Sequence, residues 1–187
     1  MARERSFDAA RLDVPAFAAA ASSLQGECAQ HELARLAASL MALPGDGLPP
    51  PVIWSAVGEQ RAQTGGPPQT WLRLQAHTTV TLQCQRCLQP MAETLVLDRW
   101  FRFVGSEDEA ERLDEDSEED VLVMSRRFDL LELLEDELIL ALPLVPRHET
   151  CPQPLPMSAG ADEVGDETAP ENPFAALAAL RGSGRGQ

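Results

Sequence analysis

Two pairs of residues could bind a metal ion: Cys84-x-x-Cys87 and, much later in the chain, His148-x-x-Cys151. Structural zinc takes four sulfur or nitrogen ligands in a tetrahedron, and an x-x spacing lets one tight turn supply two of them. The four residues therefore predict a closed site of three cysteines and one histidine. One structural zinc would be its cofactor, clamping two distant segments together and leaving no open position for catalysis.

Two other interpretations of the same residues stay open. In a reducing compartment Cys84, Cys87 and Cys151 could be ordinary buried thiols, and His148 could be a surface residue. A C-x-x-C pair can also exchange thiols, but redox proteins place it at the start of a helix in a βαβ unit. Cys28 falls in an expected loop, and we expect it to take no part in a site.

The first cysteine pair is expected at the tip of a β-hairpin. In residues 72–84 apolar side chains alternate with polar ones, which predicts a strand with one buried face and one wet, solvent-exposed face. Residues 91–104 read as the returning strand. Shorter strands at 52–57 and 121–124 would complete a small antiparallel sheet, and residues 58–69 read as a loop.

The second pair follows the clearest helix, residues 129–142. Asp129 is a good N-cap, with Glu132 three residues later, and Pro143 stops the helix. A leucine stripe occupies one side, but Leu133 and Leu140 lie off it. The helix is therefore either deeply buried or in contact with a partner.

The overall prediction is an α+β fold in which the sheet packs on helices. Residues 1–50 would form the N-terminal helical part of the domain, and residues 51–151 the sheet, an acidic loop and the 129–142 helix. Residues 152–187 would be a flexible linker and a short docking helix, too short to be stable alone in water. Candidate partner-binding residues are Leu133, Leu140, Phe174 and Leu177.

Charge is unevenly distributed. The net charge is −15, and residues 107–120 together with 149–171 carry all of it. Residues 107–120 are therefore predicted to be an acidic, disordered loop. Acidic segments suit basic partners and repel nucleic acid, but a neutral body could still present a local basic face.

Such a basic face would lie on the wet side of the hairpin and at its tip. Aromatic and arginine side chains on a sheet can stack bases and hold phosphates. The alternative is an ordinary polar sheet face. The candidate RNA-binding residues are Trp71, Arg73, Arg86, Arg99 and Arg102.

Catalysis and membrane insertion have little support in the sequence. It contains no P-loop, GxSxG, HExxH or dinucleotide loop, so we predict that the protein is not an enzyme. A metal-dependent RNA-processing hydrolase using Glu118, Glu119 and Asp120 is the enzymatic alternative, and a thiol redox protein is another. No apolar stretch approaches ~20 residues and the first residues lack a signal-peptide core, so we expect a cytoplasmic protein.

Three segments, 82–90, 128–151 and 172–180, together resemble the YceD-like family, the large ribosomal RNA subunit accumulation proteins. The resemblance implies a ribosome-biogenesis factor needed for accumulation or processing of large-subunit ribosomal RNA. It also implies metal binding through the hairpin cysteines, and it supplies no catalytic residues. The expected partners are precursor large-subunit rRNA, ribosomal proteins or RNA-processing enzymes, with no membrane and no small-molecule substrate.

Overall fold

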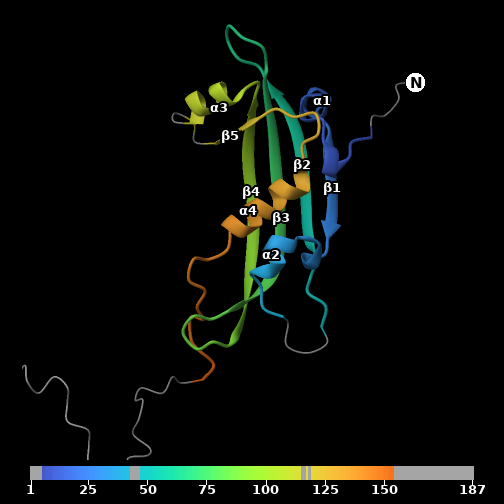
Figure 1. The fold of residues 1–187 in the computed structure, drawn as a ribbon. Helices are drawn as coiled ribbons and strands as arrows, with labels where there is room; N and C mark the ends of the chain where they lie inside the picture. Colours follow the sequence, from blue (N-terminus) through green and yellow to red (C-terminus); the bar gives the residue numbers. More distant parts are fainter. Residues whose placement is uncertain (1–5, 43–46, 115–116, 118, 154–187) are drawn as a thin grey trace, which may run out of the picture. The chain divides into compact units, whose positions relative to one another are not determined.

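A computed structural model describes residues 6–42, 47–114, 117 and 119–153. In this part of the chain five strands form one sheet in the order β1-β2-β3-β4-β5 (Figure 1). The first four strands are antiparallel neighbours, and β5 runs parallel to β4. The strands are β1 (Ser23–Cys28), β2 (Val52–Arg61), β3 (Gln69–Gln83), β4 (Pro90–Val104) and β5 (Asp120–Val123). The predicted α+β fold is confirmed.

Four α-helices and two short 3-10 helices accompany the sheet among the described residues. They are η1 (Ala9–Arg11), α1 (Val14–Ala19), η2 (Gln30–Glu32), α2 (Ala34–Ala38), α3 (Glu107–Asp114) and α4 (Leu130–Leu140). The chain divides into two units, Met1–Pro152 and Gln153–Gln187. The expected linker and docking helix, with Phe174 and Leu177, lie outside the described residues.

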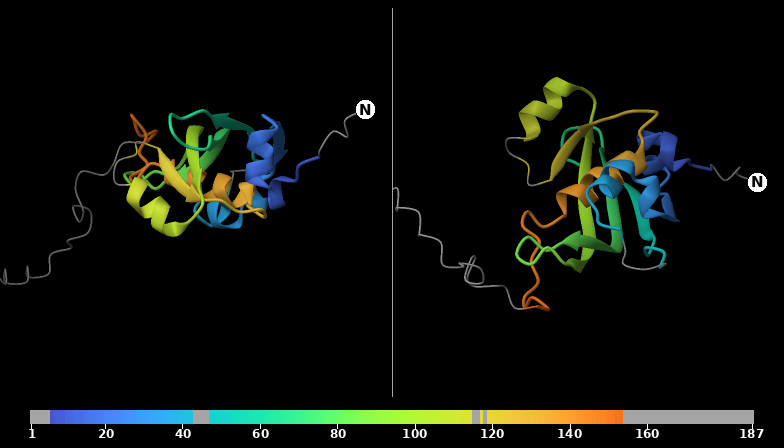
Figure 2. Two further views of the ribbon diagram at one scale, coloured as in Figure 1. Left: turned by 90° about the horizontal axis from the view of Figure 1, so that it is seen from above. Right: turned by 60° about the horizontal axis from the view of Figure 1, so that its bottom comes forward.

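The sheet buries one of its two faces, as the alternation in the sequence predicts. On β3 the even-numbered residues Leu72, Leu74 and Val80 are at most 1% exposed, whereas odd-numbered residues such as His77 face solvent. Helices α1, α2 and α4 lie on the buried side, and the opposite side carries no helix (Figure 2). We call this uncovered side the open face.

Helix α4 supplies the central contact with the sheet. Asp129 is its N-cap and accepts hydrogen bonds from the backbone N–H groups of Leu131 and Glu132, both at 3.0 Å. Leu130, Leu134 and Leu138 are fully buried against the sheet. Of the leucines off this stripe, Leu133 is partly buried on the core, whereas Leu140 is 75% exposed.

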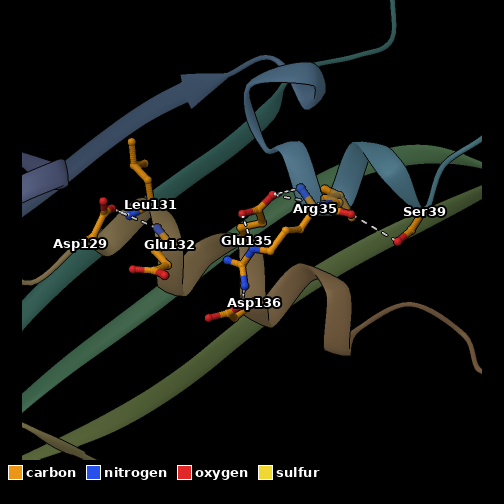
Figure 3. Close-up of polar contacts among 8 residues, drawn as sticks. Arg35, Ser39, Asp129, Leu131, Glu132, Glu135 and Asp136 are labelled. Carbon is orange, nitrogen blue, oxygen red and sulfur yellow. Dashed lines mark hydrogen bonds and ion pairs between the residues drawn. The ribbon is translucent and has the colours of Figure 1, made fainter.

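Helices α2 and α4 are joined by polar contacts centred on the Glu135 carboxylate (Figure 3). Glu135 accepts hydrogen bonds from the backbone N–H groups of Arg35 at 2.6 Å and Leu36 at 3.2 Å, and from Arg35 Nε at 2.9 Å. Arg35 also pairs with Asp136. Free N–H groups at the start of a helix need acceptors, so α4 provides the N-terminal cap that the sequence of α2 lacks.

The N-terminal region is not purely helical, which corrects the prediction for residues 1–50. Ser23–Cys28 forms β1, the edge strand that pairs with β2. A Cβ atom on Gly26 would come within 2.8 Å of Trp54 Cζ2, so the glycine lets the Trp54 ring lie across the strand. Tertiary packing therefore decides the conformation of a segment whose local pattern is weak.

The predicted acidic loop is also largely ordered. Glu107–Asp114 forms α3, and β5 begins at Asp120. Three acids occupy the first turn of α3, where the helix dipole favours negative charge, and Ala110 is buried against the rest of the unit. Helix dipole and packing together offset the repulsion on which the prediction of disorder rested.

Candidate metal centre

The tip of the β3–β4 hairpin holds Cys84 and Cys87. The turn is closed by the Cys84 N–H, which donates to the Gln89 carbonyl at 3.0 Å, and by the Leu88 N–H, which donates to the Cys84 carbonyl at 2.8 Å. Leu88 has a φ of 59°, a left-handed conformation that turns the chain back into β4. This tight turn brings the two cysteines together, as the sequence spacing predicts.

The segment that leaves α4 brings the second pair to the same place. The Gln85 N–H at the hairpin tip donates to the Pro146 carbonyl at 2.9 Å, which fastens the segment to the turn. His148 and Cys151 follow directly along the chain. The structure therefore unites two pairs that lie far apart in the sequence.

The four donor atoms lie close enough together to share one metal ion. Those of Cys84, Cys87, His148 and Cys151 all lie within 4.8 Å of one another. Cys87 Sγ is 3.4 Å from His148 Nδ1. Tetrahedral zinc would place sulfurs about 3.8 Å apart, and a sulfur and a nitrogen about 3.6 Å apart. The donor set fits a structural zinc ion, since the ligands are of the right types and shifts of about 1 Å or less would bring them to these distances.

The electrostatics of the cluster favour a thiolate at Cys84. Burial alone would raise the pKa of this thiol, which is fully shielded from solvent. Backbone N–H groups of Cys87, His148 and Arg86 and the Cys87 side chain counteract burial and lower the pKa of Cys84 to about 5. Hydrogen bonds to the charged form favour that form.

Cys151 has the opposite tendency. Burial raises its pKa, and the neighbouring Cys87 and Cys84 sulfurs raise it further. Several thiolates therefore do not coexist easily in the bare cluster. A divalent cation would remove this repulsion, because metal ligands are bound as thiolates.

Cys28 does not belong to the cluster. It is a half-buried free thiol at the end of β1, not in the loop that we expected. Burial, and next the charge of Glu32, raise its pKa. It is therefore a natural control residue for experiments on the other three cysteines.

Asp120, one of the acidic residues considered for hydrolysis, is not at this centre. Glu118 lies outside the described residues, and Asp120 pairs with Arg99. Asp120 is opposite Phe101 on β4, about 35 Å along the strand from the hairpin tip. The structure therefore does not combine Asp120 with the candidate metal ligands.

The five residues predicted to contact RNA fall into three places. Trp71, Arg73 and Arg102 lie on the open face, and Arg86 is exposed at the hairpin tip. Arg99 lies on the helix-covered side, where it contacts Asp120 and, at 3.9 Å, Glu137. Most other odd-numbered residues of β4 are apolar and face the helices. Arg99 is odd-numbered too, so its position in the sequence indicates that it points away from the open face.

Two arginines of the open face, Arg73 and Arg61, are already engaged within the chain. Arg73 donates to both carboxylate oxygens of Asp98, at 2.8 and 2.7 Å. The Arg61 guanidinium lies 4.2 Å from the Trp71 ring centre and 4.1 Å from that of Trp100. Arg61 is not among the predicted RNA-binding residues, because residues 58–69 read as a loop. Gly58 and Arg61 in fact continue the alternation of β2.

None of the helices in the described ranges is long and apolar enough to cross a membrane. Fold and cluster together define an α+β protein whose hairpin tip and helix exit form a closed Cys₃His group suited to structural zinc. The family profile for "Large ribosomal RNA subunit accumulation protein YceD" matches residues 72–181, and the chain belongs to this family, as the sequence motifs predicted.

One relative supports the assignment and also limits it. The chain is 40% identical over 106 residues to the large ribosomal RNA subunit accumulation protein YceD of Haemophilus influenzae. The match covers 54% of this chain and 60% of that relative's length. No solved structure matches the chain.

Proposed function

We propose that this protein is a non-catalytic ribosome-biogenesis factor, required for accumulation of large-subunit ribosomal RNA and active in the cytoplasm. One observation carries the proposal: the family match at residues 72–181 includes most of β3, all of β4 and α4, and all four candidate metal ligands. The matched region is thus built around a closed cluster, which suits a rigid binding module better than a catalytic centre.

We further propose that one zinc ion completes the cluster. Cys84, Cys87 and Cys151 would bind it as thiolates, and His148 would supply the fourth ligand. The ion would hold the hairpin tip against the exit of α4, the two segments already joined by the hydrogen bond between Gln85 and Pro146. Its role would be structural, because four protein donors leave no position for a substrate.

The charges favour a basic protein partner over direct contact with RNA. Phosphate binding needs uncommitted positive charge. Arg73 and Arg61 are paired with Asp98 and Glu59. A ribosomal protein or an RNA-processing enzyme with a basic surface would instead suit the acidic helices α3 and α4.

A smaller RNA contact would use the remaining cations. Arg86 at the hairpin tip and Arg102 beside Trp71 make no ion pair among the described residues. Binding of precursor rRNA by the purified protein at low salt, lost in an Arg86→Ala/Arg102→Ala variant, would favour this second mode of action.

The domain organisation is part of the same proposal. Residues 1–151 would act as one folded unit. Residues 152–187 would act as a tether that ends in a partner-binding helix with Phe174 and Leu177. Exposed Leu140 on α4 would add an apolar contact for the same partner.

The decisive experiment is depletion of the protein in its own cell. We expect the ratio of mature large-subunit to small-subunit rRNA to fall and large-subunit precursors to change in amount. Wild-type protein and a Cys28→Ser variant should restore the ratio, whereas Cys87→Ser should not. An unchanged ratio after complete depletion would overturn the proposed function.

The lowered pKa of Cys84 favours one competing function, a thiol redox protein. That function requires a reversible disulfide between Cys84 and Cys87 in cells. Trapping thiols with an alkylating agent before lysis would distinguish the two, since a zinc site predicts that both cysteines are reduced in every growth condition.

A further inference from the structure

Strand β4 is longer than its outer neighbour. Strand β3 pairs with the whole of β4, from Pro90 to Phe103, but β5 pairs only with Phe101–Val104. Figure 1 shows β5 beside only the end of β4 that is nearer α3. The other ten or so residues of β4 therefore form an outer edge of the sheet.

The register shows which backbone groups point out of this edge. The Gln89 carbonyl accepts from Cys84 on the β3 side, whereas the Val104 carbonyl accepts from Met124 on the β5 side. The pairing with β3 is continuous, so no bulge changes the order. Backbone groups alternate in direction along a strand, and the even-numbered residues therefore point outward.

The outward N–H and C=O groups beyond the reach of β5 belong to Ala92, Thr94, Val96 and Asp98. Trp100 is left out because it adjoins Phe101, where the pairing with β5 begins. Pro90, at the start of the strand, is also an outward-pointing position. Proline has no N–H, but no hydrogen bond to β3 is lost, because the N–H at this position would point away from β3. Four residues, Ala92, Thr94, Val96 and Asp98, thus present an unpaired ladder that could accept another strand.

Side chains around the edge leave it accessible. Val96, at its centre, is 71% exposed, an unusual state for a valine in a strand. The segment leaving α4 does not bury its apolar side chains here, because Leu144 is fully exposed and Val145 is half exposed. The edge also lacks the lysine or bulge that commonly blocks strand pairing.

The surroundings of the edge are acidic. Helix α4, which contacts β4, carries four acids and no basic residue. Arg35 pairs with two of them, Glu135 and Asp136, but Glu132 on α4 and Glu93 on β4 make no ion pair among the described residues. The cation on this side of the strand, Arg99, is already held by Asp120 and Glu137.

We propose that the β4 edge, Ala92–Asp98, binds an extended, positively charged segment of a partner protein as an added strand. The segment would alternate apolar and basic residues. Successive side chains of a strand point to opposite faces, so its apolar residues would lie beside Val96 on the open face and its basic residues would face α4. This inference rests on the proposed function as a binding factor and names the kind of partner.

The test uses the full-length protein and a labelled nine-residue peptide of alternating lysine and valine. Binding is measured by fluorescence anisotropy, and a glutamate–valine peptide serves as the charge control. We expect the basic peptide to bind, the acidic peptide not to bind, and added salt to weaken binding. Equal binding of both peptides, or of neither, would overturn the proposal.

A backbone variant tests the strand pairing itself. Val96→Pro removes one outward N–H without removing a bond to β3, so the fold should survive. We expect it to weaken peptide binding by at least about fivefold, the effect of one lost hydrogen bond. Val96→Ala keeps the N–H and should bind within about twofold of wild type. Unchanged binding by a folded Val96→Pro protein would contradict strand addition.

Amide hydrogen exchange on the wild-type protein keeps the test valid if the proline variant fails to fold. The peptide should slow exchange at Thr94, Val96 and Asp98. Absence of protection there would overturn the proposal. Protection that appears without peptide as the protein dimerises would also overturn it, because a second copy would then occupy the edge. Protection that requires single-stranded RNA would do the same, because RNA would then be the occupant.

The peptide-binding experiment and the depletion experiment test different proposals, and their results can be distinguished. Normal rRNA accumulation after depletion, together with peptide binding at the edge, would overturn the proposed function and leave the edge assignment. A fall in rRNA that Val96→Pro reverses as well as wild type, with no peptide binding, would overturn the edge assignment alone.

Discussion

Glu135 on α4 caps α2 by accepting the backbone N–H of Arg35 at 2.6 Å (Figure 3). The same carboxylate takes the Leu36 N–H and the Arg35 Nε. One side chain thus satisfies the start of a helix a hundred residues earlier in the chain. Because α4 also leads directly to His148 and Cys151, this contact helps to place both the N-terminal region and the candidate metal centre.

Glu135→Gln should lower the free energy of unfolding by about 1–3 kcal/mol, because one backbone acceptor and the charge partner of Arg35 are lost. Urea unfolding followed by circular dichroism measures the change. Glu132→Gln, on the exposed side of the same helix, is the matched control and should stay within about 0.5 kcal/mol of wild type. Equal stability of the two variants would show that the cap does not stabilise the fold.

The same residue predicts a loss of stability in acid. Burial would raise the pKa of Glu135, but hydrogen bonds from Leu36 and Arg35 hold it below the ordinary value of 4.5. A carboxyl with a depressed pKa contributes stability above its unfolded pKa and loses it as pH falls through the folded pKa. Stability should therefore fall below about pH 4.5, and Glu135→Gln should flatten this part of the profile.

Glu137, two residues later, should have the opposite effect. Burial raises its pKa, Arg99 lowers it, and Asp120 and Asp136 raise it further. Glu137 therefore binds a proton more tightly in the folded than in the unfolded protein. The free energy of unfolding falls as pH rises from 4.5 through the raised pKa. Glu137→Gln should be more stable than wild type at pH 7 and similar to it at pH 4. A destabilised variant at pH 7 would mean that the contact with Arg99 outweighs burial.

The purified, reduced protein should contain about one zinc ion per chain by elemental analysis. Cys87→Ser should lose it and unfold at a lower temperature. A ligand at a thousand times its Kd stabilises a protein by about 4 kcal/mol, which sets the expected scale. Cys28→Ser should keep both metal and stability. Metal-free protein with unchanged stability in all variants would identify the cysteines as simple thiols.

Gly58→Ala should destabilise the junction between β2 and α1. Its Cβ would lie 2.6 Å from Phe17 Cδ1 and 2.8 Å from Ala18 Cα, and backbone atoms cannot move aside cheaply. We expect a loss of about 1–3 kcal/mol. Gly66→Ala is the control, because its Cβ would meet only the flexible end of Gln63 at 2.6 Å. Thermal unfolding of the two variants should differ clearly.

Local patterns in the sequence were sufficient for the main elements. The alternation of residues 72–84 predicted β3, and the cap at Asp129 with its leucine stripe predicted α4, because strand and helix periods are properties of short segments. The x-x spacing of the two ligand pairs likewise marked Cys84, Cys87, His148 and Cys151.

Long-range packing decided the rest. Ser23–Cys28 became a strand because β2 was available to pair with it, and α3 formed where packing of Ala110 offset the repulsion of its acids. Nothing in the local sequence shows that Glu135 reaches Arg35, that the two ligand pairs meet, or that β5 leaves most of β4 unpaired. Each of these relationships depends on segments far apart in the chain, and only folding decides which of them lie next to each other.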